Sequence, residues 1–94
     1  MAFARIAVFP GGTKEQYDYL AQLMGEGVAQ QPQRRVIAAG PSEEGWTIFQ
    51  VWDSKESLER FIEDHLRPAM ERAGDRGYPQ PPTITDIELV DLHL

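Results

Sequence analysis

The segment Trp46–Trp52 constrains the fold of this chain more than any other part of the sequence. Aromatic and β-branched residues fill it almost throughout, which is typical of a β-strand. Alternation gives the strand two faces, with Trp46, Ile48, Gln50 and Trp52 on one and Thr47, Phe49 and Val51 on the other. Neither face is polar enough for free exposure to water, so both faces need a covering layer.

The remaining segments place this strand third in the order strand, helix, strand, strand, helix, strand. The expected strands are Phe3–Phe9, Arg35–Gly40, Trp46–Trp52 and Ile84–Leu94, and the expected helices run from Thr13 to about Met24 and from Ser54 to about Ala73. Right-handed crossovers then give an α+β, ferredoxin-like fold, in which a four-stranded antiparallel sheet carries both helices on one face.

Local signals mark where the two helices begin. Thr13 and Gln16 have the spacing of a capping box, in which each side chain bonds the backbone N–H of the other residue. Either Asp53 or Ser54 can cap the second helix, and Glu56 is placed to complete a box from Asp53.

Other signals mark helix ends and an interruption. Gly25 and Gly27 fit the end of the first helix, and Gly74 fits the end of the second. Pro68 lies inside the second helix, where it removes one backbone bond and clashes with the preceding turn. We therefore expect a kink near His65–Arg67, or a break after which Pro68 starts a new short helix.

Size and composition limit the class of protein. A chain of 94 residues and 10.6 kDa predicts a single domain over residues 1–94. The absence of cysteine excludes disulfides, thiolate nucleophiles and zinc fingers, and a net charge of −6 argues against nucleic acid as a partner. The apolar start of the chain is about ten residues long, too short to span a membrane, so we expect a cytoplasmic protein without a membrane partner.

The doubly apolar strands also predict an assembly. Helices cover only one face of a ferredoxin-like sheet, and a bare apolar face would be a patch of the size that marks an interface. The simplest closure is a two-fold homodimer with sheet face on sheet face. In the alternative, Trp46 and Trp52 cap the ends of a monomeric core.

The run Gly45–Ser54, followed by Leu58, Phe61 and Leu66–Ala69, resembles the dimeric α+β barrel superfamily. Within it, the chain is most similar to small proteins related to antibiotic biosynthesis monooxygenases. The resemblance implies a dimeric barrel and a small-molecule enzyme like the members that oxidise aromatic polyketides without metal or flavin. Other members cleave haem, isomerise or cyclise their substrates, or have no known activity, so the fold alone does not name a reaction.

Individual positions narrow what the resemblance implies. Many monooxygenase-like members carry a histidine where this chain has Phe61, and many carry glutamate where it has Gln50. Haem-cleaving members place tryptophan at the position of Phe61 and histidine near that of Glu71. This chain has neither, so the resemblance does not extend to haem cleavage.

Six residues are candidates for the site. The expected catalytic residues are His65 and Gln50, and the expected substrate-binding residues are Trp52, Tyr17, Phe61 and Tyr78. His65, on the apolar stripe of the second helix, could face a pocket as a base or orienting group, or could be a packed histidine that bonds a backbone carbonyl. Gln50 could orient a ligand carbonyl or tie strands together across a dimer. Tyr78 lies in a Gly/Pro-rich loop that could act as a lid.

No metal or cofactor is expected. The two histidines lie on different elements, and no metal-ligand spacing or phosphate-binding glycine motif occurs. The leading prediction is a small-molecule enzyme acting on an aromatic or polyketide-like substrate, in the manner of a cofactor-independent monooxygenase. The alternatives are a binding protein without catalysis and a purely structural dimerisation module.

Overall fold

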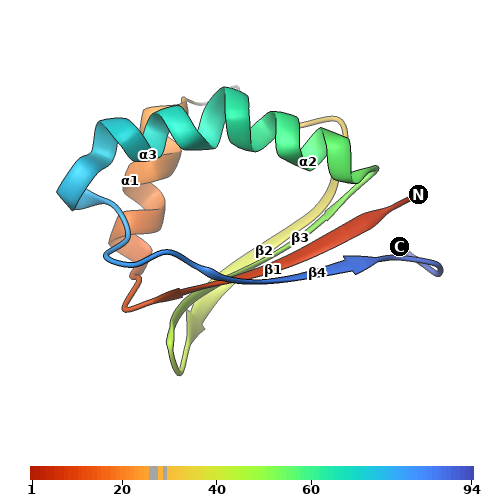
Figure 1. Cartoon of the computed structure of the whole chain (residues 1–94), viewed down its shortest axis with the longest axis horizontal. Helices are drawn as coiled ribbons and strands as arrows, with labels where there is room; N and C mark the ends of the chain where they lie inside the picture. Colours follow the sequence, from red (N-terminus) through yellow and green to blue (C-terminus); the bar gives the residue numbers. More distant parts are fainter. Residues whose placement is uncertain (26–27, 29) are drawn as a thin grey trace.

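In a computed structural model that describes residues 1–25, 28 and 30–94, the chain forms a four-stranded antiparallel sheet with its helices on one face (Figure 1). The strands are β1 (Phe3–Pro10), β2 (Arg34–Ser42), β3 (Gly45–Trp52) and β4 (Thr83–Glu88), in the order β2-β3-β1-β4. The helices are α1 (Lys14–Met24), α2 (Lys55–Phe61) and α3 (Arg67–Ala73), with a π-helical turn (Ile62–Leu66) before α3 and a 3-10 turn (Gly74–Arg76) after it. This is the predicted ferredoxin-like fold.

The helix starts follow from local chemistry. The Thr13 hydroxyl accepts a hydrogen bond from the backbone N–H of Gln16, and the Gln16 side chain accepts one from the backbone N–H of Thr13, so the predicted capping box is confirmed. Ser54 caps α2, because its hydroxyl oxygen accepts a hydrogen bond from the backbone N–H of Ser57. The box from Asp53 does not form, because the Asp53 carboxylate pairs with Arg35 instead.

The predicted interruption near Pro68 is present as a π-helical turn. The backbone N–H of Arg67 bonds the carbonyl of Ile62, five residues back, where an α-helix would bond four back. Pro68, which has no N–H, lies in the first turn of α3, where none is needed. Gly25 follows α1 with a φ of 95°, as predicted for a helix end, whereas Gly27 lies outside the described residues.

The predicted extent of the last strand, Ile84–Leu94, is wrong. β4 ends at Glu88, which pairs with Phe3, the first residue of β1. One more backbone bond follows, from Leu89 N–H to the carbonyl of Ala2, and beyond it β1 offers no residue to pair with. The apolar alternation of the tail continues, but a strand also needs a neighbour to bond. β2 is longer than predicted at both ends.

Strand register gives the sheet two faces of opposite character. The covered face, beneath the helices, carries Phe3, Arg5, Ala7, Phe9, Arg34, Ile37, Ala39, Pro41, Trp46, Ile48, Gln50, Trp52, Ile84, Asp86 and Glu88. The open face carries Ala4, Ile6, Val8, Val36, Ala38, Gly40, Thr47, Phe49, Val51, Thr83, Thr85 and Ile87. Except for Arg35, which lies at the pairing shift of β2 and pairs with Asp53, the charged residues of the sheet are on the covered face. The open face holds apolar residues, glycine, threonine and Ser42, whose hydroxyl accepts a hydrogen bond from Thr47.

The core lies between the covered face and the helices. Trp52 and Leu58 are its largest fully buried side chains, and they pack with Phe3 and Phe61. A second cluster forms at the other end of the sheet around Phe9 and Trp46. Because the clusters lie at opposite ends of β1 and β3, the middle of the covered face is filled less completely, and the site lies there.

Candidate functional site

A cavity of about 120 Å³ lies between the covered face and the helices. Its described polar lining consists of Tyr17 from α1, Arg34 from β2, Gln50 from β3 and Tyr78 from the loop before β4. A larger space of about 490 Å³ adjoins it over β1 and β4. The two compartments share part of their walls, formed by Phe9, Ile48, Gln50 and Leu66. Together they reach the size range of ordinary small-molecule sites.

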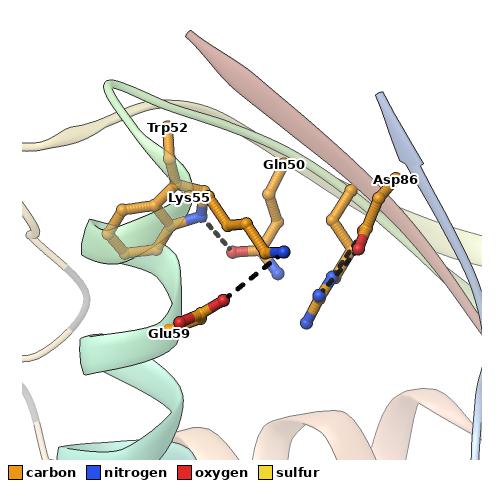
Figure 2. Close-up of polar contacts among 6 residues, drawn as sticks. Gln50, Trp52, Lys55, Glu59 and Asp86 are labelled. Carbon is orange, nitrogen blue, oxygen red and sulfur yellow. Dashed lines mark hydrogen bonds and ion pairs between the residues drawn. The ribbon is translucent and has the colours of Figure 1, made fainter. Parts of the chain in front are cut away.

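Gln50 lines both compartments, and a neighbour fixes its amide. The indole Nε1–H of Trp52 donates to Gln50 Oε1 at 3.0 Å, and Figure 2 shows the two side chains side by side. Trp52 is 1% exposed, so its ring is held by packing. The bond from Trp52 takes one of the two lone pairs of this oxygen and fixes the orientation of the amide, so that its N–H groups and the second lone pair can serve a bound molecule.

Tyr78 provides a second polar group. Its ring stacks on the ring of Phe9 with centroids 3.9 Å apart. The ring edge lies against Gly12, where a Cβ atom would come to 3.0 Å from Cδ1 of Tyr78. The Tyr78 hydroxyl is buried and has no hydrogen-bond partner among the described residues. Burial raises the pKa of this phenol far above its ordinary value, so it stays a neutral donor. A buried donor without a partner fits a site that a ligand or water oxygen completes.

Arg34 brings positive charge to the cavity wall. Its guanidinium carbon lies 5.7 Å from the ring centroid of Trp52 and 5.5 Å from that of Phe61, within the range of cation–π attraction. Burial lowers the pKa of Arg34, because a half-buried charge loses part of its hydration.

The adjoining compartment has its own ion pair. Arg5 and Asp86 face each other across β1 and β4 in a two-pronged contact, with N–O distances of 2.8 and 3.0 Å. Figure 2 shows Asp86 with the dashed lines of this contact. The hydrogen bond from Arg5 lowers the pKa of the Asp86 carboxyl. Arg67 and Glu71 line the same compartment from α3. A carboxylate is therefore present here, but not in the described lining of the smaller cavity.

The structure brings four of the six predicted site residues into one cavity: Tyr17, Gln50, Phe61 and Tyr78. Trp52 lies behind Gln50 and orients it. The structure places His65 elsewhere, in a separate hollow of about 70 Å³ that it lines with Trp52, Gln31 and Gln33 among others.

The π-helical turn explains the position of His65. In a regular α-helix, His65 would lie one turn beyond Phe61 on the same stripe. The wider turn Ile62–Leu66 displaces it around the axis, and Leu66 takes the place over the cavity. The His65 ring still touches that of Phe61, with centroids 5.6 Å apart.

In the sequence, Arg34 and Arg35 could meet an acidic ligand, but two adjacent arginines usually form a solvated edge, so neither is among the six predicted site residues. The pairing of β2 with β3 shifts between Arg34 and Val36, so alternation is interrupted there. Arg34 consequently turns under the helices, while Arg35 pairs with Asp53. A bulge of this kind leaves little trace in sequence.

Two general properties of the described residues are relevant to function. No group of three or more His, Cys, Asp or Glu side chains among them is arranged to hold a metal ion. Likewise, none of the described helices is both long and apolar enough to cross a membrane.

Solved structures with this architecture come from several bacteria. A candidate antibiotic biosynthesis monooxygenase from Caulobacter crescentus superposes with a TM-score of 0.73 at 18% identity, covering 96% of this chain and 91% of that one. Another candidate antibiotic biosynthesis monooxygenase, from Chloroflexus aurantiacus, superposes with a TM-score of 0.69 at 20% identity, covering 99% of this chain and 97% of that one. A dimeric ferredoxin-like protein of unknown function from Thermobifida fusca superposes with a TM-score of 0.66 at 16% identity, covering 95% of this chain and 92% of that one.

The chain has the fold of the antibiotic biosynthesis monooxygenase-like proteins. The predicted likeness to this superfamily is thus confirmed at the level of fold. No protein-family model matches the sequence, and no curated protein matches it. At these identities the likeness concerns the fold alone, and the chemistry of the cavity decides what the protein can bind.

Proposed function

We propose that this protein is a small-molecule enzyme of the cofactor-independent monooxygenase type, acting on an aromatic or polyketide-like compound. The observation that carries the proposal is the cavity between the covered face and the helices. It combines ring-lined walls from Phe9 and Phe61 with the polar side chains of Gln50, Tyr17 and Tyr78. Such walls suit a flat apolar ring, and the polar groups suit oxygen atoms on its edge.

The reaction we propose needs only the substrate and molecular oxygen. An activated ring methylene is oxidised to a carbonyl, one oxygen atom of O₂ enters the product, and the other leaves as water with the two methylene hydrogens. The substrate supplies all the electrons. Gln50 donates to a ring oxygen and holds the negative charge that develops when a proton leaves the methylene. His65 borders the separate hollow, so we give it no contact with the bound ring.

One observation favours a second candidate, a binding protein without catalysis. The described lining of the smaller cavity contains no carboxylate and no histidine that could serve as a general base. A protein with this lining can hold an aromatic compound without transforming it. Turnover separates the two candidates.

The proposal includes a homodimer formed through the open face. Phe49 and Ile87 on this face are 37% and 42% exposed, and the only charged residue of the described strands outside the covered face is Arg35, near the start of β2. An exposed apolar face of this composition is typical of a protein interface. The solved structure from Thermobifida fusca is itself described as dimeric.

The test uses 1,8-dihydroxyanthrone as substrate, with oxygen consumption and anthraquinone formation as readouts. We expect turnover above the rate with heat-denatured protein, and at least a tenfold loss in Gln50→Leu, on the scale of one hydrogen bond to a developing charge. Gln22→Leu, on the exposed side of α1, is the matched control and should keep full activity. Binding without turnover would support the second candidate. Absence of both binding and turnover would contradict both candidates.

A further inference from the structure

We infer that Glu71 is the general base of the reaction, and that its carboxylate takes the proton from the ring methylene of the substrate in the compartment adjoining the smaller cavity. The inference rests on the proposed function, since it assumes that a substrate with an activated methylene binds between the covered face and the helices. It adds the residue that starts the reaction and the compartment in which the proton is removed.

The first argument is size. The smaller cavity, at about 120 Å³, is below the usual range of small-molecule sites, whereas the adjoining compartment has about 490 Å³. A substrate of several rings that enters the smaller cavity therefore extends past the shared wall into the adjoining compartment. Gln50 lies in that shared wall, so a substrate oxygen bound to its amide keeps the neighbouring ring atoms beside both compartments.

The second argument is the position of the possible bases. Removal of a proton from carbon needs a group such as a carboxylate or an imidazole within reach. The described lining of the smaller cavity contains neither, and His65 borders the separate hollow. Beside the adjoining compartment, the Asp86 carboxylate accepts two hydrogen bonds from Arg5, at 2.8 and 3.0 Å. These bonds lower the pKa of the Asp86 carboxyl, which makes it a weaker base.

Glu71 is the carboxylate that remains available. It follows Arg67 by one turn of α3, at a spacing that allows an ion pair, but Arg67 pairs with Glu63 on the preceding turn instead. The Glu71 carboxylate consequently has no hydrogen-bond or ion-pair partner among the described residues. Glu71 borders the compartment from the helices, while Gln50 borders it from the sheet. A ring between them can offer an oxygen to the amide and a methylene to the carboxylate.

The step that we assign to Glu71 balances without an oxidant. One C–H bond of the methylene breaks, the proton goes to the carboxylate, and the electron pair of that bond is delocalised onto the ring oxygen as an enolate. Gln50 donates to this oxygen, and Arg5, its direct neighbour across β1 and β3, lines the same compartment. Molecular oxygen reacts only afterwards, in the oxidation proposed above.

The test follows proton removal under nitrogen, where the oxidation cannot occur. Deuterium from D₂O replaces the methylene protons of 1,8-dihydroxyanthrone, and proton NMR measures the rate above that in buffer alone. We expect the wild type to catalyse this exchange and Glu71→Gln to lose about 100-fold in rate, the usual contribution of a general base. Glu15→Gln, which removes a carboxylate from the exposed first turn of α1, should exchange at the wild-type rate.

A second variant separates the action of a base from a role in packing. Glu71→Ala leaves room for a small carboxylate, so formate should restore its exchange in proportion to the formate concentration and should not change the rate of Glu15→Gln. Both Glu71 variants should bind 1,8-dihydroxyanthraquinone within about twofold of the wild type, because the apolar walls that hold the rings are intact. Quenching of tryptophan fluorescence measures this binding, and thermal unfolding shows whether each variant is folded.

The outcomes separate this inference from the proposed function. Exchange at the wild-type rate in folded Glu71→Gln would overturn the role of Glu71 and leave the proposed function in place. A loss of exchange in Glu71→Ala that formate does not restore would mean that Glu71 acts by packing, and would also overturn the inference. Exchange that depends on Glu71, in a protein that does not oxidise the compound in air, would support the inference and contradict the proposed oxidation. Absence of exchange in the wild type would contradict both.

Discussion

The two faces of the sheet are made from the same strands but have opposite compositions. Within β1, Arg5 lies on the covered face and its neighbour Ile6 on the open face. A monomer that exposed its open face would be expected to show the reverse arrangement, with charges facing water. The difference indicates that the covered face borders a largely apolar cavity with a few polar groups in its wall, whereas the open face suits another apolar surface.

The largest expected effect comes from a charge on the open face. Phe49→Lys should convert the proposed dimer into a folded monomer and weaken association more than about 100-fold, because an unpaired charge buried in an apolar interface costs several kcal/mol. Sedimentation velocity measures the change. Gln22→Lys, with the same charge on α1, should leave the dimer intact. A dimeric Phe49→Lys protein would remove the open face as the interface.

A core truncation on the covered side should act on the fold instead of the assembly. Leu58 is 0% exposed and packs against Phe3, Trp52 and Phe61. Leu58→Ala should lower the free energy of unfolding by about 2–5 kcal/mol, through lost burial and the cavity that remains. Urea unfolding measures this loss. If the variant unfolds like the wild type, the core is assigned to the wrong side of the sheet.

The alkaline stability of the protein should depend on Tyr78. Burial raises the pKa of its phenol in the folded state, so the folded protein keeps a proton that the unfolded chain releases above a pH of about 10. This contribution is complete below that pH and is lost as the pH rises further. Tyr78→Phe should therefore lose less stability than the wild type between neutral and strongly alkaline pH in urea unfolding. Parallel losses would mean that the phenol is exposed.

The smallest effect is expected at His65. It lines the separate hollow, so His65→Ala should leave affinity for 1,8-dihydroxyanthraquinone, the product of the proposed reaction, within about twofold and change stability by about 1 kcal/mol or less, as for most partly exposed substitutions. Fluorescence titration and thermal unfolding on one preparation measure both. Loss of binding in a folded His65→Ala protein would restore the catalytic role that its place on the helical stripe predicts.

Local patterns in the sequence predict most of the fold. The alternation of side chains along a strand predicts which residues of β1 and β3 share a face, and the Thr13 capping box predicts the start of α1. Both signals depend only on residues close in sequence. The same reasoning brings Tyr17, Gln50 and Phe61 to one cavity.

The parts that sequence did not predict depend on pairing and helix geometry in three dimensions. A shift in the pairing of β2 brings Arg34 under the helices. The wide turn before Pro68 exchanges His65 for Leu66 at the cavity. The tail after Glu88 has the alternation of a strand, but no further residue of β1 lies beside it.

One measurement tests the division between the two faces most directly. Sedimentation equilibrium of the protein with 1,8-dihydroxyanthraquinone, the product of the proposed reaction, can be followed both in the protein absorbance and in the visible band of the ligand. The account predicts a mass near twice 10.6 kDa in both signals, with about one ligand bound per chain. A mass of one chain would contradict the role of the open face, and a ligand that sediments as a free small molecule would contradict the role of the cavity.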